Sequence, residues 1–225
     1  MKFSFLSNAK AFGGQLAVLC AASCVAHVAF AKDLTFDKVF SDKAEPSSIH
    51  YQATYQNQSG EHQLEVWRDG QQRLKRRTDD SLETYATRAA GEAEFQMSVL
   101  DLKKKIHTRV DRTNLYRIGN FTDWYDLAHG LRHPKGDYQL AAIAAPANAP
   151  KALDACKWYG LTQQDRTTQI CWSERSRIPL LILDQDGKAV WTVTKVERHP
   201  ISPKVFVIND EGFIKNDANQ DIEKD

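Results

Sequence analysis

The sequence lacks a long apolar run, a strong charge imbalance and abundant cysteine. Its longest apolar stretch, residues 16–31, is too short and too often broken to predict a membrane-spanning helix. With 30 basic and 29 acidic side chains among 225 residues, the chain is nearly neutral. A nucleic-acid-binding protein is expected to carry a strongly basic face, so neutrality argues against a nucleic-acid partner.

Catalytic signatures are also missing. The sequence contains no Gly-x-Ser-x-Gly motif of the kind that presents a nucleophilic serine. The adjacent carboxylates Asp79–Asp80 and Asp210–Glu211 would point to opposite faces of a strand, so we interpret each pair as a turn. We therefore predict a protein that is not an enzyme and needs no cofactor. A hydrolase or metal enzyme with a site assembled from distant residues remains the alternative.

One histidine pair has partial metal-binding spacing. Asp126, His129 and His133 lie at i, i+3 and i+7, and two histidines four residues apart can bind zinc from one helical face. No glutamate follows the first histidine, however, and Gly130 and Pro134 interrupt the helical pattern. We predict a polar helix face here and no metal site.

The first 31 residues resemble a cleavable secretory signal peptide. Lys2 and Lys10 are their only charges, an apolar run follows, and Ala29–Phe30–Ala31 provides a cleavage site before Lys32. Cleavage would leave residues 32–225, a length that suits one domain with its own core. We therefore predict a periplasmic protein, exported as one domain.

A lipoprotein signal is the rival interpretation of this segment. Cys20 and Cys24 both lie in the apolar run, and residues 21–24 come nearest to the lipidation motif. Neither cysteine has a convincing motif around it, so we consider lipid anchoring the less favoured alternative.

The two remaining cysteines lie in a predicted β-hairpin. Apolar and polar residues alternate on either side of a polar turn at residues 163–166, which would place Cys156 opposite Cys171. Opposed residues of antiparallel strands lie close enough to form a disulfide. An even number of cysteines in an exported chain supports this bridge, and two free thiols are the alternative.

Most of the mature chain has the alternation of β-strands. Residues 49–56 alternate between an aromatic face with Tyr51 and Tyr55 and a polar face, which predicts a half-buried strand. Asp69–Gly70 is a hairpin signal. Further strands are predicted at residues 82–88, 95–102, 104–111, 115–118, 138–143, 179–183, 189–193 and 205–208, and everything from Gly212 onward is predicted to be a polar tail.

Two helices interrupt this pattern. Residues 34–40 predict a short amphipathic helix that ends before Pro46. Residues 121–131 predict a second, whose apolar face carries Phe121, Trp124 and Tyr125. A single aromatic helix in a strand-rich chain must cover a sheet or the mouth of a barrel. It is either ordinary core packing or a lid over a hydrophobic cavity.

Two basic clusters, Arg73–Arg77 and Lys103–Lys105, allow two interpretations. They could contact anionic phospholipid at a membrane surface. They could also be the solvated faces of edge strands, where basic side chains discourage pairing with other sheets, and we favour this second interpretation.

The order of these elements resembles the periplasmic lipoprotein-carrier family, LolA-like and LolB-like. The most similar part is the C-terminal third, where Pro179–Gly187, Val190–Thr194 and Val205–Ile208 followed by Gly212–Phe213 match the closing pattern of strand, glycine turn, long strand and phenylalanine-containing strand. The resemblance implies an incomplete β-barrel with helices over its open side and a hydrophobic cavity for acyl chains. The Cys156–Cys171 hairpin and the basic strands depart from that pattern.

These observations predict a mainly β, α+β fold: one antiparallel sheet of about eleven strands, curved into an incomplete barrel, with the mid-chain helix over its open side. We expect a monomeric, non-enzymatic carrier of a lipid or other hydrophobic ligand. The ligand would lie between Tyr51 and Tyr55 on the sheet and Phe121, Trp124 and Tyr125 on the helix. An envelope interaction or stress-sensing protein that binds a protein partner is the alternative.

Overall fold

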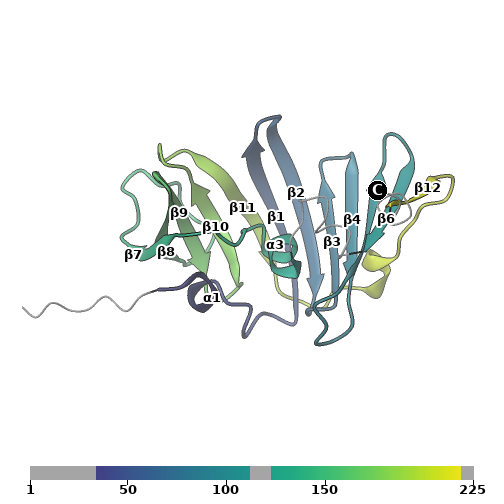
Figure 1. Cartoon of the computed structure of the whole chain (residues 1–225), viewed down its shortest axis with the longest axis horizontal. Coiled ribbons are helices and arrows are strands. Elements are labelled where there is room, and N and C mark those ends of the chain that lie inside the picture. Colours follow the sequence, from purple (N-terminus) through teal and green to yellow (C-terminus); the bar gives the residue numbers. More distant parts are fainter. Residues whose placement is uncertain (1–33, 112–122, 219–225) are drawn as a thin grey trace, which may run out of the picture. The chain divides into compact units, whose positions relative to one another are not determined.

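The computed structural model describes residues 34–111 and 123–218, which belong to one compact unit spanning Asp33–Asp225. These residues form one open sheet and a few short helices (Figure 1). The helical elements are α1 (Phe36–Val39), α3 (Trp124–His129) and the 3₁₀ helix η1 (Pro203–Phe206). The strands are β1 (Ser48–Asn57), β2 (Gly60–Asp69), β3 (Arg73–Thr78), β4 (Leu82–Thr87), β5 (Gln96–Asp101), β6 (Ile106–Asp111), β7 (Gln139–Ile143), β8 (Lys157–Gln163), β9 (Arg166–Ser173), β10 (Ile178–Leu183), β11 (Ala189–Glu197) and β12 (Ile214–Asp217).

The twelve strands form a single sheet in the order β12-β6-β5-β4-β3-β2-β1-β11-β10-β9-β8-β7. Successive strands pair as antiparallel hairpins within each half, and the pairing of β1 with β11 joins the two halves. A register shift between Gln52 and Ala53 marks a β-bulge in that junction. The mainly β fold and the short helices are confirmed.

Alternation along β1 and β2 gives this sheet two different faces. Tyr51, Ala53, Leu64 and Val66 are buried on the face that α3 lies against, and we call this side the helix-bearing face. Figure 1 shows α3 in front of the middle of the sheet, beside β1, β2 and β3. The residues between them in sequence, such as Trp67, point to the opposite face.

Three details of the predicted sheet are wrong. The sheet has twelve strands, and it is mixed because β12 runs parallel to β6. Residues 205–208 do not form the predicted strand. The 3₁₀ helix η1 begins at Pro203 and includes the first two of these residues. The last strand, β12, lies in the segment predicted to be a polar tail, and its four side chains are exposed. The strand predicted at residues 115–118 lies outside the described residues.

The prediction that the basic segment Arg73–Arg77 lies on an edge strand is also wrong. It forms β3, which lies between β2 and β4 and is not an edge strand. Lys103–Lys105 lie at the turn between β5 and β6.

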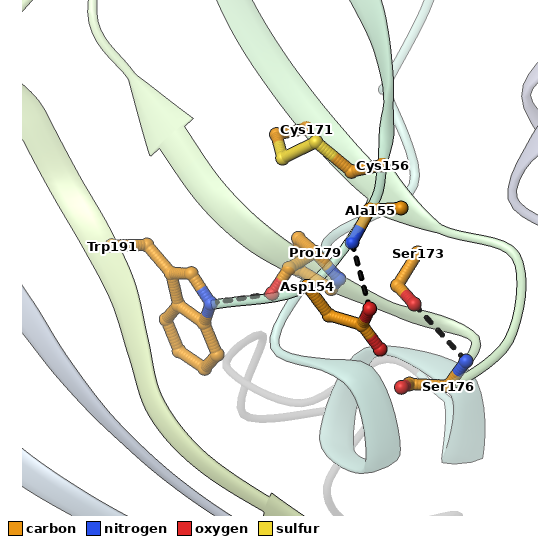
Figure 2. Close-up of a disulfide and its surroundings, with 8 residues drawn as sticks. All are labelled: Asp154, Ala155, Cys156, Cys171, Ser173, Ser176, Pro179 and Trp191. Atoms are coloured by element: carbon orange, nitrogen blue, oxygen red, sulfur yellow. Dashed lines mark hydrogen bonds between the residues drawn. A yellow bond between two sulfur atoms is a disulfide. The ribbon is translucent and has the colours of Figure 1, made fainter. Parts of the chain in front are cut away.

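The disulfide is present, but it is not formed by directly opposed residues. Gln163 pairs with Arg166, which confirms the turn predicted at residues 163–166, but in this register Trp158 and not Cys156 lies opposite Cys171. Cys156 therefore precedes β8 and reaches Cys171 diagonally, with the two Cα atoms 5.4 Å apart (Figure 2). Just before Cys156, the Asp154 carboxylate accepts a hydrogen bond from the Ala155 backbone N–H at 2.8 Å (Figure 2).

Within the described part of the chain, no helix is long and apolar enough to span a membrane.

Candidate functional site: the helix-bearing face beneath α3

The site is formed where α3 lies on the sheet. Asp123 caps the helix, since its carboxylate accepts a hydrogen bond from the Asp126 N–H at 2.8 Å. Gly130 ends it in the left-handed conformation, and its N–H donates to the Asp126 carbonyl. A helix of six residues is too short to persist alone, so its contacts with the sheet must hold it in place.

Two sheet side chains provide partners for the C-terminal carbonyls of α3. Arg76 Nη1 on β3 donates to the Leu127 carbonyl at 3.2 Å, and the Tyr51 hydroxyl on β1 donates to the Ala128 carbonyl at 3.4 Å. These carbonyls have no partner inside the helix, and they carry the negative end of its dipole. The guanidinium of Arg76 therefore stabilises both the hydrogen-bonding groups and the dipole of α3.

A buried polar cluster attaches the same helix to β2 and to the segment before β1. Its members are Arg68, Glu45 and His129, whose side chains are 1%, 8% and 2% exposed. Glu45 Oε1 lies 2.5 Å from His129 Nε2 and 3.4 Å from Arg68 Nη1, and Arg68 Nη1 lies 2.8 Å from the same imidazole nitrogen. One cluster thus joins three segments that are distant in sequence.

Burial determines the charge state of this cluster. Loss of solvent lowers the pKa of His129, which favours the neutral imidazole at pH 7. Its Nδ1 lies 2.8 Å from the Tyr125 carbonyl one turn earlier and is assigned as the donor, so Nε2 accepts a hydrogen bond from Arg68, and Arg68 holds the Glu45 carboxylate beside the ring. Arg68 and Glu45 then carry opposite charges in a site closed to water.

Aromatic side chains fill the space around the polar contacts. Tyr51 and Tyr55 each lie 6.4 Å from Trp191 between ring centroids, and the Trp191 indole N–H donates to the Pro179 carbonyl at 2.9 Å (Figure 2). Gly130 fits against the same indole, since a Cβ at this position would lie 2.5 Å from Trp191 Cη2. The end of α3 is therefore packed closely on β11.

The predicted ligand-binding residues are only partly brought together. Tyr51 lies beneath the end of α3, whereas Tyr55 packs on Trp191 and stacks on His62. Trp124, only 5% exposed, packs on Phe95, 5.8 Å away, with the Arg88 guanidinium over its ring. Tyr125 stacks on His129 at 4.0 Å. Phe121 lies outside the described residues.

Sequence reasoning missed the polar residues of the site, although a signal for two of them was present. Arg68 follows Leu64 and Val66 with the period of two that places side chains on the helix-bearing face, and Arg76 follows Leu74 in the same way. A charged residue at a position that alternation assigns to the core indicates a buried partner or a ligand contact. Glu45 offered no such signal because it lies in an irregular segment.

The residues considered for metal binding do not form the set suggested by their spacing. His129 points inward to Glu45, while Asp123, Asp126 and His133 come together, with one ligand atom from each within 4.8 Å of the others. Hydrogen bonds already link them: the His133 N–H and imidazole Nδ1 both contact Asp126 Oδ1 at 3.1 Å. This group therefore fastens the chain after α3 back onto the start of the helix.

Comparisons with known proteins assign no family to this arrangement. No family model matches the chain, and no curated protein matches it. The functional argument therefore rests on the geometry of the helix-bearing face.

Proposed function

We propose that the protein is a non-enzymatic carrier of a lipid or another hydrophobic ligand in the cell envelope, and that α3 is the lid of its binding site. The observation that carries this proposal is an open twelve-stranded sheet whose apolar central face is covered by a six-residue helix. In this proposal the sheet is an incomplete barrel of the kind found in lipoprotein carriers, which the sequence resembles.

The contacts of α3 suit a movable cover. The helix is attached through side-chain hydrogen bonds from Tyr51 and Arg76 and through the Arg68–Glu45–His129 cluster. Its apolar side, with Trp124 and Leu127, is buried against the sheet, so displacing the helix would expose apolar surface beside the charged side chains of Arg68 and Arg76. Burying an acyl chain there would favour binding by about 0.8 kcal/mol per CH₂ group.

The proposed location rests on the signal-like residues 1–31 and on the Cys156–Cys171 disulfide, which suits an oxidising compartment.

Native mass spectrometry of the protein purified from the envelope, followed by organic extraction and lipid analysis, tests this function. We expect one lipid to co-purify per chain, and Trp124→Ala to lose it while circular dichroism stays unchanged. Trp67→Ala is the matched control, because Trp67 lies on the opposite face of β2 and stacks on His50 at 5.0 Å. A ligand-free mass for the wild type, with no uptake of added fatty acid or phospholipid, would refute the carrier.

A second candidate is an envelope interaction or stress-sensing protein with the same fold and a filled core. The close packing of Tyr51, Trp124 and Leu127, each at most 5% exposed, favours this alternative. It predicts the ligand-free mass described above, together with retention of the native fold when lipid is absent.

A further inference from the structure

Several hydrogen-bond donors beneath α3 have no partner within the described residues. They are Nε and Nη2 of Arg68, Nε1 of Trp172 and the hydroxyl of Tyr125, all of them buried. Each of these three side chains adjoins His129: Arg68 by a 2.8 Å contact, Tyr125 by ring stacking at 4.0 Å, and Trp172 with ring centroids 6.3 Å apart. Buried polar groups in folded proteins are nearly always hydrogen-bonded, so this concentration around one imidazole requires an explanation.

The chemistry of these groups defines the missing partner. Guanidinium and indole nitrogens only donate hydrogen bonds, and a phenol hydroxyl can donate one. Their common partner is therefore an acceptor. Other unpartnered buried atoms of the described residues lie on other strands, as at Nε of Arg77 on β3 and Nε2 of His107 on β6.

The charged side chains of the helix-bearing face narrow the chemical class of this acceptor further. Arg68 and Arg76 contribute two positive charges to the helix-bearing face, whereas Glu45 contributes one negative charge. The groups that act electrostatically on Arg76 are Tyr51, Tyr55 and Arg132, and none of them is a carboxylate. Residues 112–122 contain no aspartate or glutamate in the sequence. An anionic head group would therefore meet no carboxylate among the groups that act on Arg76, although Glu45, Asp42 and Asp126 act on the Tyr125 hydroxyl.

The two arginines lie close enough to serve one ligand. Val66 pairs with Arg76 across β2 and β3, and Arg68 is two residues further along β2 on the same face. Both guanidinium groups act electrostatically on Tyr51, which lies beneath the end of α3. Apolar side chains, among them Val66 and Leu127, adjoin this charged area.

We infer that the ligand is an amphiphile with a single oxyanion head group, bound by Arg76 and by the unpartnered donors of Arg68, Trp172 and Tyr125. Its acyl chain lies along the apolar surface that α3 covers. A carboxylate of a fatty acid and a phosphate of a lipid share this chemistry. The inference rests on the proposed carrier function and specifies the class of its ligand.

The test compares three probes with the same twelve-carbon chain: dodecanoate, dodecyl phosphate and dodecanol. Binding of each to the full-length protein is measured by isothermal titration calorimetry below the critical micelle concentration. We expect at least one of the two anions to bind about tenfold more tightly than the neutral alcohol, since charge-assisted hydrogen bonds are the stronger kind. The tighter of the two anions identifies carboxylate or phosphate as the natural head group.

Two variants locate the head group. Arg76→Gln and Tyr125→Phe are expected to reduce the preference for the anion to about twofold, while dodecanol binds as before. Arg77→Gln is the matched control, because Arg77 is the neighbour of Arg76 on the opposite face of β3 and pairs with Asp80. It should keep the full preference. Circular dichroism checks that each variant is folded.

The outcomes distinguish failure of the head-group inference from failure of the proposed carrier function. Equal binding of anions and alcohol would overturn the oxyanion head group and leave the carrier intact. A preference that persists in both Arg76→Gln and Tyr125→Phe would place the head group elsewhere and overturn the assigned site. Failure of all three probes to bind would count against the carrier itself.

Discussion

At the scale of single residues, the stability of the site depends on charges that are almost completely removed from water. Arg68 and Glu45 compensate each other, and His129 fills the remaining space as a neutral base. Removing one member of a buried ion pair leaves the other uncompensated, which costs more than the pair contributes.

Replacing Glu45 with glutamine should therefore lower the free energy of unfolding by about 3–5 kcal/mol. The variant leaves the Arg68 guanidinium buried beside a neutral amide. Urea denaturation followed by tryptophan fluorescence measures the change. The control is Glu174→Gln, which breaks the exposed pair with Lys157 and should leave the unfolding midpoint nearly unchanged. A midpoint for Glu45→Gln equal to that of the control would show that the cluster adds no stability.

Histidine 133 gives the protein one component of its pH dependence. The hydrogen bond to Asp126 raises its pKa above the ordinary value of 6.5, and Asp123 and Asp37 act in the same direction. The folded state therefore holds this proton more tightly than the unfolded chain does. The stabilisation is complete below pH 6.5 and is lost as pH rises through the raised pKa.

His129 acts in the opposite sense, because its lowered pKa makes protonation of the unfolded chain destabilising as pH falls below 6.5. We expect His133→Gln to abolish the loss of stability between pH 6.5 and pH 8.5 and to retain the loss at lower pH. Urea midpoints across this range measure both effects. An unchanged slope above pH 6.5 in the variant would rule out His133 as its source.

At the scale of elements, local sequence signals locate most helices and strands but not their partners. The period-two pattern of residues 49–56 predicts β1, and Asp69–Gly70 predicts the turn between β2 and β3. All four side chains of strand β12 are exposed, so its sequence has no apolar alternation that could predict a strand. Its pairing with β6 is made by backbone hydrogen bonds, which leave no such pattern. The predicted Cys156–Cys171 disulfide is confirmed, but its two residues are offset along the strands, since hairpin register depends on the turn at Gln164, where φ is +51°.

The C-terminus of α3 provides a test of packing at this scale. Gly130→Ala would place a methyl group 2.5 Å from Trp191 Cη2, and φ of +69° disfavours alanine as well. Gly136→Ala is the matched control, with φ of +77° and no atom within 4 Å of the added Cβ.

We expect Gly136→Ala to lose about 1 kcal/mol of unfolding free energy through backbone strain alone. Gly130→Ala should lose about 1–3 kcal/mol more, because the ring of Trp191 must move. Urea denaturation compares the two. Equal losses of unfolding free energy would mean that the Trp191 ring can move away without an energetic penalty and that α3 is loosely packed on the sheet.

The hairpin of β8 and β9 provides a second test. Replacing Cys156 with serine and Cys171 with alanine should lower the unfolding free energy by about 3 kcal/mol, the value for a loop of about 15 residues. Urea denaturation of the double variant measures the loss. Wild-type protein treated with a reducing agent should show a similar loss, and no loss in either experiment would mean that the bridge only fastens a hairpin that is already stable.

At the scale of the whole molecule, the sheet is expected to be most stable at its centre. β1 is hydrogen-bonded on both sides, to β2 and β11, whereas β12 and β7 are the two edges. Composition and alternation predict the β-rich class but not this order, since the pairing of β1 with β11 joins segments about two thirds of the chain apart. The polar residues of the site escaped prediction for the same reason, because Glu45, Arg68 and His129 meet only when the sheet is assembled.

Amide hydrogen exchange monitored by mass spectrometry tests this gradient. Peptides covering β1 and β2 should exchange slowest, and those covering β12 should exchange within the shortest labelling time, because all four of its side chains are exposed and one strand edge is free within the described residues. Protection of β12 comparable to that of β1 would indicate that a partner covers this edge.

The pairing of His50 with Glu197 has a consequence for how the chain reaches its native state. β1 is synthesised long before β11, the strand that completes its hydrogen bonding. Contacts of such high sequence separation slow folding, and the unpaired side of β1 remains open to other chains in the meantime. The nascent chain therefore cannot complete its central sheet until β11 has been synthesised, and until then folding depends on protection of that ten-residue strand.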